Sequence, residues 1–186
     1  MGRDGNGNAW RHRQWRPHGR TGIRRKLGAR KLTEEPQFGF DELYISPFRW
    51  KRRFDEEGRV NYEAVDRWPL KTTGVRLMDA YLWYLADGES DLEAFADKHG
   101  LRREDIDSMV FILTGMRGVD FRQRFQMRQA DELMRYTSLT LAEVARHSGL
   151  GSANNLYLSY KRDFNLAPGY RRLSIRKEGD VGRFRL

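Results

Sequence analysis

The sequence has no cysteine and no long run of apolar residues. Without cysteine there is no disulfide framework, no zinc finger and no thiol chemistry, as expected for a reducing compartment. No apolar run approaches the length of a membrane span, and the first thirty residues lack the apolar core of a signal peptide. We therefore expect a cytoplasmic protein with no membrane partner.

Patterns typical of enzymes and metal sites are missing as well. The four histidines stand at positions 12, 18, 99 and 147, and no two of them have metal-ligand spacing. There is also no Ser-His-Asp set and no glycine-rich phosphate loop. We predict no catalytic activity, no metal and no cofactor.

Acidic residues are nearly absent from residues 1–31, which hold ten Lys and Arg against the single acid Asp4. The net charge of +9 resides in this segment, because the other 155 residues hold 25 basic and 25 acidic side chains. With few large apolar groups besides Trp10 and Trp15, the segment cannot form a core of its own. We predict a flexible basic arm.

Arginine pairs well with phosphate oxygens, so the arm is expected to bind nucleic acid. The alternatives are a solvated arm without a partner and an Arg-rich organelle transit peptide, which the scarcity of Ser disfavours. The arm residues expected at phosphates are Arg11, Arg13, Arg16, Arg20, Arg24, Arg25 and Lys26.

The stretch from Thr140 to Arg172 carries the clearest motif. Thr140 and Glu143 have capping-box spacing, which predicts a helix from Leu141 to about His147, followed by a turn at Gly149. Ser152 can cap a second helix, in which apolar side chains recur every four residues from Leu156 to Phe164. Two short helices joined by a turn containing Gly are typical of a helix-turn-helix, although a helical hairpin in a bundle has the same spacing.

The order of residues in this stretch resembles the second helix-turn-helix of the AraC family of bacterial transcription regulators. The matching positions are Val144, Ala145, Gly149, Leu150, Ser152, Leu156, Tyr160, Lys161, Arg162, Phe164, Pro168 and Arg172. The sequence departs from the family at Leu158, where an Arg that reaches DNA is usual, and at Asn165, which replaces a Gly. The spacing from Pro168 to Tyr170 is one residue short.

Residues 74–136 extend the resemblance, which covers over half of the chain. Helices are expected from Val75 to Ala86 and after Ser90, which forms a second capping box with Glu93. A third expected helix begins near Arg102 and Arg103, has Ile106, Met109, Val110 and Leu113 on one face and ends at Gly115. A long helix from Asp120 to about Tyr136 resembles the connecting helix of the family. The predicted fold is mainly α, with two helix-turn-helix motifs joined by a long helix.

Residues 32–73 are dense in aromatic side chains and are expected to pack on the helical domain. Alternation from Phe48 to Phe54, a turn at Asp55–Gly58 and residues 60–65 predict a short hairpin, with a helix from Tyr62 to Trp68 as the competing interpretation. The predicted organisation is therefore a basic arm at 1–31, an irregular or hairpin extension at 32–73, the double motif at 74–172 and a tail at 173–186.

Charge separates the two motifs. Residues 74–120 hold five basic and ten acidic side chains, whereas residues 121–172 hold nine basic and four acidic ones. Because phosphate contacts supply most sequence-independent affinity, we infer that the second motif meets DNA and that the first has lost this role. Phe111 and Ile112 of the first motif are expected to pack on residues 32–73 or on a protein partner, while Arg102 and Arg103 are the alternative phosphate contacts there.

The resemblance implies a sequence-specific regulator that binds double-stranded DNA. Asn154 and Asn155 are expected at base edges, although two Asn near a helix start can also serve as capping groups; Leu158 is expected at a thymine methyl. The full set of predicted DNA-facing residues is Ser152, Ala153, Asn154, Asn155, Tyr157, Leu158, Lys161, Arg162, Arg146, Arg102 and Arg103. The alternative is a module repurposed to bind RNA through the arm, or RNA polymerase or another protein through the first motif.

Overall fold

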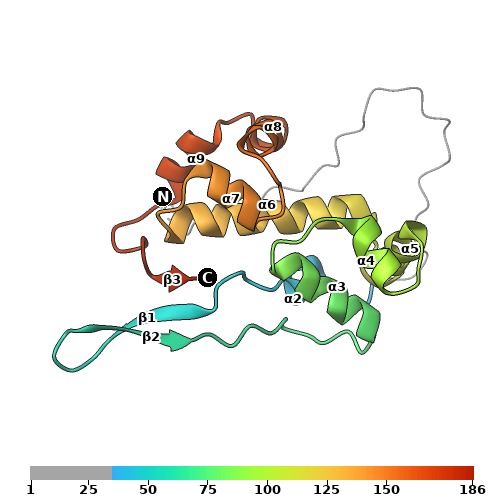
Figure 1. The fold of residues 1–186 in the computed structure, drawn as a ribbon, viewed down its shortest axis with the longest axis horizontal. Coiled ribbons are helices and arrows are strands. Elements are labelled where there is room, and N and C mark those ends of the chain that lie inside the picture. The colour runs from blue at the N-terminus through green and yellow to red at the C-terminus, as the bar shows by residue number, and fades with distance from the viewer. Residues whose placement is uncertain (1–34) are drawn as a thin grey trace, which may run out of the picture.

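The computed structural model describes residues 35–186, so the arm at residues 1–31 lies outside the described range. Within this range the fold is mainly helical, as predicted (Figure 1). The elements in chain order are α2 (Phe40–Leu43), β1 (Trp50–Phe54), β2 (Val60–Ala64), α3 (Arg76–Ala86), α4 (Leu92–Lys98), α5 (Arg103–Thr114), α6 (Gly118–Tyr136), α7 (Leu141–His147), α8 (Ala153–Phe164), α9 (Pro168–Ile175) and β3 (Phe184–Arg185).

Helix α6 runs through the middle of the molecule and contributes to two cores (Figure 1). Phe121 and Phe125, near its start, pack with α3, α4 and α5 in the first core. Met127, Leu133 and other apolar residues of its later turns pack with α7 and α8 in the second core. The structure therefore confirms the prediction of two helix-turn-helix motifs joined by a long helix.

The segment before α3 contributes to both cores. Phe40, Leu43 and Ile45 are buried in the first core, where the Phe40 ring meets Phe121 edge-on with the centroids 5.4 Å apart. Phe48 is buried in the second core.

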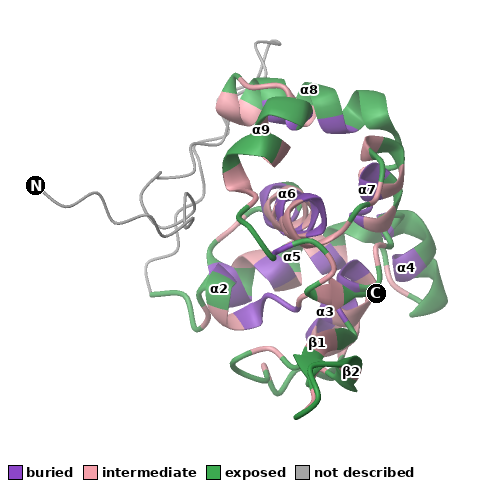
Figure 2. Ribbon diagram, turned by 90° about the vertical axis from the view of Figure 1, so that its left-hand side faces the viewer, coloured by how far each residue is buried: buried purple, intermediate pink, exposed green. Residues whose placement is uncertain are grey.

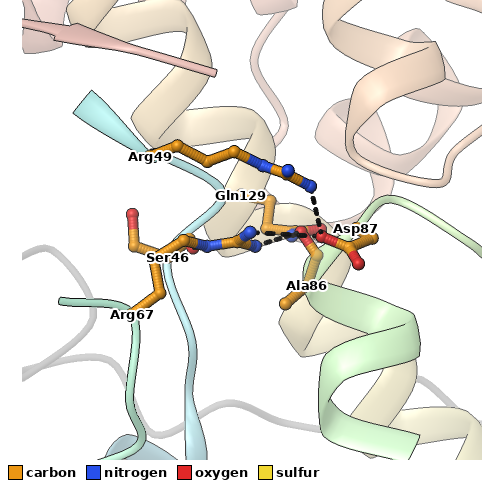
Figure 3. Close-up of polar contacts among 6 residues, drawn as sticks. All are labelled: Ser46, Arg49, Arg67, Ala86, Asp87 and Gln129. Atoms are coloured by element: carbon orange, nitrogen blue, oxygen red, sulfur yellow. Dashed lines mark hydrogen bonds and ion pairs between the residues drawn. The ribbon is translucent and has the colours of Figure 1, made fainter. Parts of the chain in front are cut away.

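Arg67 fastens this segment to the end of α3 (Figure 3). Its Nε donates to the Ser46 carbonyl at 3.0 Å, and its Nη1 donates to Asp87 Oδ1 at 3.2 Å. Its Nη2 donates at 3.2 Å to the carbonyl of Ala86, which also accepts from Gln129 of α6 at 3.0 Å. These bonds join the extension, α3 and α6 at one point.

The predicted hairpin is confirmed, and the competing helix from Tyr62 to Trp68 is wrong. Strands β1 and β2 pair antiparallel, with Arg52 opposite Tyr62. Strand β3 was not predicted; it returns from the C-terminal segment and pairs with β1 to give the order β2-β1-β3. Phe184 of β3 stacks on Phe48 with the ring centroids 5.1 Å apart, and this contact between distant residues leaves no local signal.

The local signals around the second motif are confirmed. Thr140 and Glu143 form the capping box, and the Ser152 hydroxyl accepts the backbone N–H of Asn155. Gly149 takes the left-handed conformation, with a φ of 74°. Asn165 ends α8 with a φ of 53°, which Asn tolerates better than most residues, so it can replace the Gly usual there.

Two helix boundaries differ from the prediction, and one helix was not predicted. Asp91 rather than Ser90 caps α4, because its carboxylate accepts the N–H groups of both Glu93 and Ala94. Helix α6 begins at Gly118, two residues before Asp120. Helix α9 was not predicted; Pro168 stands at its first position, where the fixed φ favours a helix, and residue 172 falls inside it.

The turn after α3 and the turn after α7 approach each other closely at Gly88 and Gly149. Gly88, which follows α3, has a φ of 83°, and a Cβ at this position would lie 2.4 Å from the His147 carbonyl oxygen at the end of α7. Because real Cβ atoms do not approach so closely, only Gly allows this contact.

Gly88→Ala should lower the free energy of unfolding by about 2–5 kcal/mol, because a left-handed residue costs about 1–2 kcal/mol and an overpacked contact about 1–3 kcal/mol. Gly100→Ala is the control, since Gly100 has a φ of 67° and open space around an added Cβ. The control should lose only about 1–2 kcal/mol. Urea unfolding measures both values, and equal losses would show that the Gly88 contact does not constrain the motifs.

Candidate nucleic-acid interface

The second motif presents α8 as an outward-facing helix. Leu156 and Tyr160 are fully buried against α6 and α7, which fixes the rotation of α8 about its axis. Every predicted DNA-facing position of the helix and its cap is exposed: Ser152, Ala153, Asn154, Asn155, Tyr157, Leu158, Lys161 and Arg162. The apolar side chains among them are well exposed, at 44% for Tyr157 and 55% for Leu158.

The two adjacent asparagines have different roles in the structure. Asn155 donates from its side-chain Nδ2 to the Leu150 carbonyl at 3.1 Å, which closes the turn between α7 and α8. Asn154 has no hydrogen-bond partner among residues 35–186, so its amide is free to meet another molecule. Of the predicted pair, Asn154 is therefore the better candidate for a base contact.

The predicted cations of this motif also differ. Lys161 and Arg146 are exposed and form no ion pair within residues 35–186, although Lys161 lies 5.9 Å from the Tyr157 ring centroid. Arg162 is paired with Asp163, its Nε lying 2.8 Å from the carboxylate. Asp163 also accepts a hydrogen bond from Gln123 of α6 at 3.0 Å. The Asp163 carboxylate therefore points toward α6, whereas the Lys161 side chain points toward solvent.

The charge count of residues 121–172 overstates the basic surface. Five of the nine cations are engaged inside the molecule with carboxylates or backbone carbonyls: Arg124, Arg128, Arg135, Arg171 and Arg172. A sequence count cannot separate these from exposed cations, because salt bridges between distant segments leave no local pattern.

Tyr160, Asp131 and Arg171 hold α8 and α9 on α6. The Tyr160 hydroxyl donates to Asp131 Oδ1 at 2.7 Å, and Arg171 forms a two-point pair with the same carboxylate, with donor–acceptor distances of 3.0 and 2.5 Å. Burial raises the pKa of Tyr160 well above its usual value, and the neighbouring Asp131 charge acts in the same direction. This cluster was not predicted, because its one signal in the sequence is an acid, Asp131, beside the apolar residues of α6.

The first motif presents a different surface. Arg102 donates from its backbone N–H to Asp105 at 2.9 Å, and this hydrogen bond is the main reason that the pKa of Asp105 is lowered. Arg103 lies between two carboxylates, 3.9 Å from Asp107 and 4.0 Å from Glu93. Both arginines therefore have acids beside them where a phosphate would have to bind.

The exposed face of α5 also carries an apolar side chain. Ile112 is 64% exposed, so it does not pack on residues 32–73, and the other expected contact, with a protein partner, stays a prediction. Phe111 is half-buried. The segment approaches α5 through its backbone instead, with the Phe38 N–H donating to the Leu113 carbonyl at 3.1 Å.

Among residues 35–186, every helix is too short or too polar to cross a membrane. The predicted phosphate contacts of the arm, at Arg11, Arg13, Arg16, Arg20, Arg24, Arg25 and Lys26, lie outside the described residues.

The sequence matches no family model and no curated protein. Among solved structures, the C-terminal domain of AraT, a response regulator from Geobacillus stearothermophilus, is 17% identical with a TM-score of 0.49, covering 56% of this chain and 86% of that one. The DNA-binding domain of AdpA, a global transcriptional factor solved with a target DNA, is 24% identical with a TM-score of 0.46, covering 53% and 90%. A transcriptional regulator from Chromobacterium violaceum, described as AraC-type, is 15% identical with a TM-score of 0.40, covering 54% and 98%. The similarity thus spans about half of this chain.

Arg171→Ala should lower the free energy of unfolding by about 3–5 kcal/mol, because it removes the cation from a buried carboxylate. The side chains of Arg171 and Asp131 are only 13% and 8% exposed. Arg53→Ala is the matched control, since Arg53 and its partner Glu63 are 60% and 46% exposed and the loss should stay below about 1 kcal/mol. Urea unfolding measures both, and equal losses would contradict the role of the buried pair.

Tyr160→Phe should lower the free energy of unfolding by about 1.5–3 kcal/mol near neutral pH, since it removes a hydrogen bond to a charged group. The raised pKa of Tyr160 in the folded state means that its stabilisation is complete below the unfolded pKa, about 10, and is lost as the pH rises further. The difference between the two proteins should therefore shrink above about pH 10. Urea unfolding at pH values on both sides of this point measures it, and a constant difference would contradict the assignment.

Proposed function

We propose that the chain is a DNA-binding transcription regulator that reads a duplex through α8. The observation that carries this proposal is the absence of acidic side chains from the exposed face of α8. Its one acid, Asp163, is only 9% exposed. Helix α5, in the equivalent position of the first motif, has Glu104, Asp105 and Asp107 in its first turns.

Each group on the outer face of α8 has a role in this proposal. Asn154, in the first turn, has the amide that can pair bidentately with adenine, and Leu158 supplies an apolar contact for a thymine methyl. Lys161 and Arg146 are the phosphate contacts, and Arg162 becomes a third if it exchanges Asp163 for a phosphate. Ser152, Ala153, Asn155 and Tyr157 complete the surface that lies against the groove. The basic arm adds sequence-independent affinity.

The exposed Ile112 among acids favours a second function for the first motif. A phosphate backbone would be repelled there, whereas a protein with a basic rim around an apolar contact would fit. We propose that this face binds a protein such as RNA polymerase, and that Arg102 and Arg103 do not contact DNA.

Selection of bound sequences from a random duplex pool tests the main proposal. The full chain should enrich a motif about one half-site long, and a protein lacking residues 1–31 should enrich the same motif with lower affinity. Retention of the pool without enrichment, lost with the arm, would favour the alternative in which the chain binds nucleic acid generally and the helical domain binds a protein or RNA.

Point substitutions assign the roles on the enriched duplex. Lys161→Ala should weaken binding and reduce the slope of log K against log salt by about 1, as the loss of one phosphate contact requires. Asn154→Ala should relax the preference at one base pair by about 1–3 kcal/mol. Arg103→Ala is the control and should change neither quantity; if it weakened binding as much as Lys161→Ala, the first motif would also contact DNA.

A further inference from the structure

The three-stranded sheet lies on the opposite side of α6 from α8 in both ribbon views (Figures 1 and 2). One face of the sheet lies toward the second core, because Phe184 of β3 packs there on Phe48 and Tyr136. The other face carries the exposed Trp50, Phe54 and Val60, while Arg52 and Tyr62 on the same face are half-buried and bond the loop at Gly179–Gly182. The DNA contacts proposed for α8 involve no residue of this face.

The strand register places aromatic and basic side chains together on the solvent face. Successive side chains of a strand alternate between faces, so Trp50, Arg52 and Phe54 of β1 share one side. Tyr62 lies opposite Arg52, Val60 opposite Phe54, and Arg185 opposite Trp50. We call Trp50, Arg52, Phe54, Val60, Tyr62 and Arg185 the sheet face.

The large apolar groups of the sheet face are exposed. Phe54 is 64% exposed, Val60 51% and Trp50 44%. Apolar groups that gather in this way, rather than being scattered singly, mark a binding surface.

The charge of the sheet face is positive. Arg52 and Arg185 belong to it, and no carboxylate does. Glu63, the acid of β2, points to the other face, where it pairs with Arg53 at 2.5 Å. Of the three acids in the hairpin turn, Asp55 and Glu57 pair with Arg59, and Glu56 is exposed.

Two arginines of the sheet face lie close to aromatic rings. The Arg185 guanidinium carbon lies 3.7 Å from the centroid of the Tyr62 ring, whose hydroxyl donates to the Gly182 carbonyl at 2.8 Å. Arg52 donates to the Gly179 carbonyl at 2.8 Å while its guanidinium lies 5.4 Å from the Phe54 ring centroid. These hydrogen bonds restrain Arg52 and Tyr62 in the absence of a ligand.

We propose that the sheet face binds the unpaired bases of a single-stranded nucleic acid. Aromatic rings and guanidinium planes stack on bases, and arginines also attract the phosphates, so one surface satisfies both parts of the ligand. A duplex keeps the faces of its bases stacked inside and is a poor ligand for such a surface. RNA and melted DNA share the chemistry, and the sheet lies on the opposite side of α6 from α8 (Figures 1 and 2).

Fluorescence anisotropy of labelled oligonucleotides with the full chain tests this proposal. The probes are a uridine and a thymidine oligomer of about twelve nucleotides, within the range of known single-strand site sizes, and a duplex of equal length. The double variant Trp50→Ala/Phe54→Ala should lose at least about fivefold in single-strand affinity for each ring removed. Trp50→Phe, which keeps a ring, should retain most of the affinity. The two oligomers distinguish RNA from DNA as the preferred ligand.

The control is Trp68→Ala, which removes an exposed Trp outside the sheet. It should leave single-strand affinity unchanged, and the double variant should retain both duplex affinity and the unfolding midpoint of the parent. Because the arm is intact in every protein, a double variant that binds single strands as tightly as the parent would assign this binding to the arm and would overturn the proposal. An equal loss of duplex affinity would also overturn it, since the sheet face would then have no ligand of its own.

Discussion

Helix α6 is the element on which the rest of the structure depends, because it is buried along two different stretches. Its early turns supply Phe121 and Phe125 to the first core, and its later turns supply Met127, Leu133 and Met134 to the second. The two motifs have no shared core apart from this helix and the extension. Their relative position therefore depends on α6, on the close approach of Gly88 to His147, and on the Arg67 bonds to the end of α3 (Figure 3).

One scaffold thus carries two surfaces with different chemistry. Both recognition-type helices bury apolar residues inward, at Ile106 and Val110 in α5 and at Leu156 and Tyr160 in α8. Their outward faces diverge, because burial constrains only the inner face. The acids beside Arg103 disfavour phosphate on α5, whereas Lys161 on α8 faces solvent with Asp163 turned inward. The sheet adds a third surface on the other side of α6.

Prediction from the sequence succeeded where the cause was local. The Thr140–Glu143 capping box, the Ser152 cap and the β1–β2 hairpin each depend on residues close together in the chain. It failed for β3, because the pairing of this strand joins residues 50 and 185. It also failed to distinguish the two adjacent asparagines, because only the folded turn brings the Asn155 side chain to the Leu150 carbonyl. The charge of residues 121–172 was counted correctly but misread as surface, since five of its cations are committed to internal partners.

The sequence by itself determined the helical periodicity, the caps and the left-handed turns of this protein, because each is decided within a few residues by backbone sterics and hydrogen bonding. Only the tertiary structure decided which polar groups remain available to a ligand. That outcome depends on ion pairs between distant segments, such as Asp131 with Arg171, and on the strand register that turns Trp50 and Phe54 outward while Phe184 turns in. Contacts between distant segments occupy some polar side chains and leave others available, and the local sequence does not indicate which.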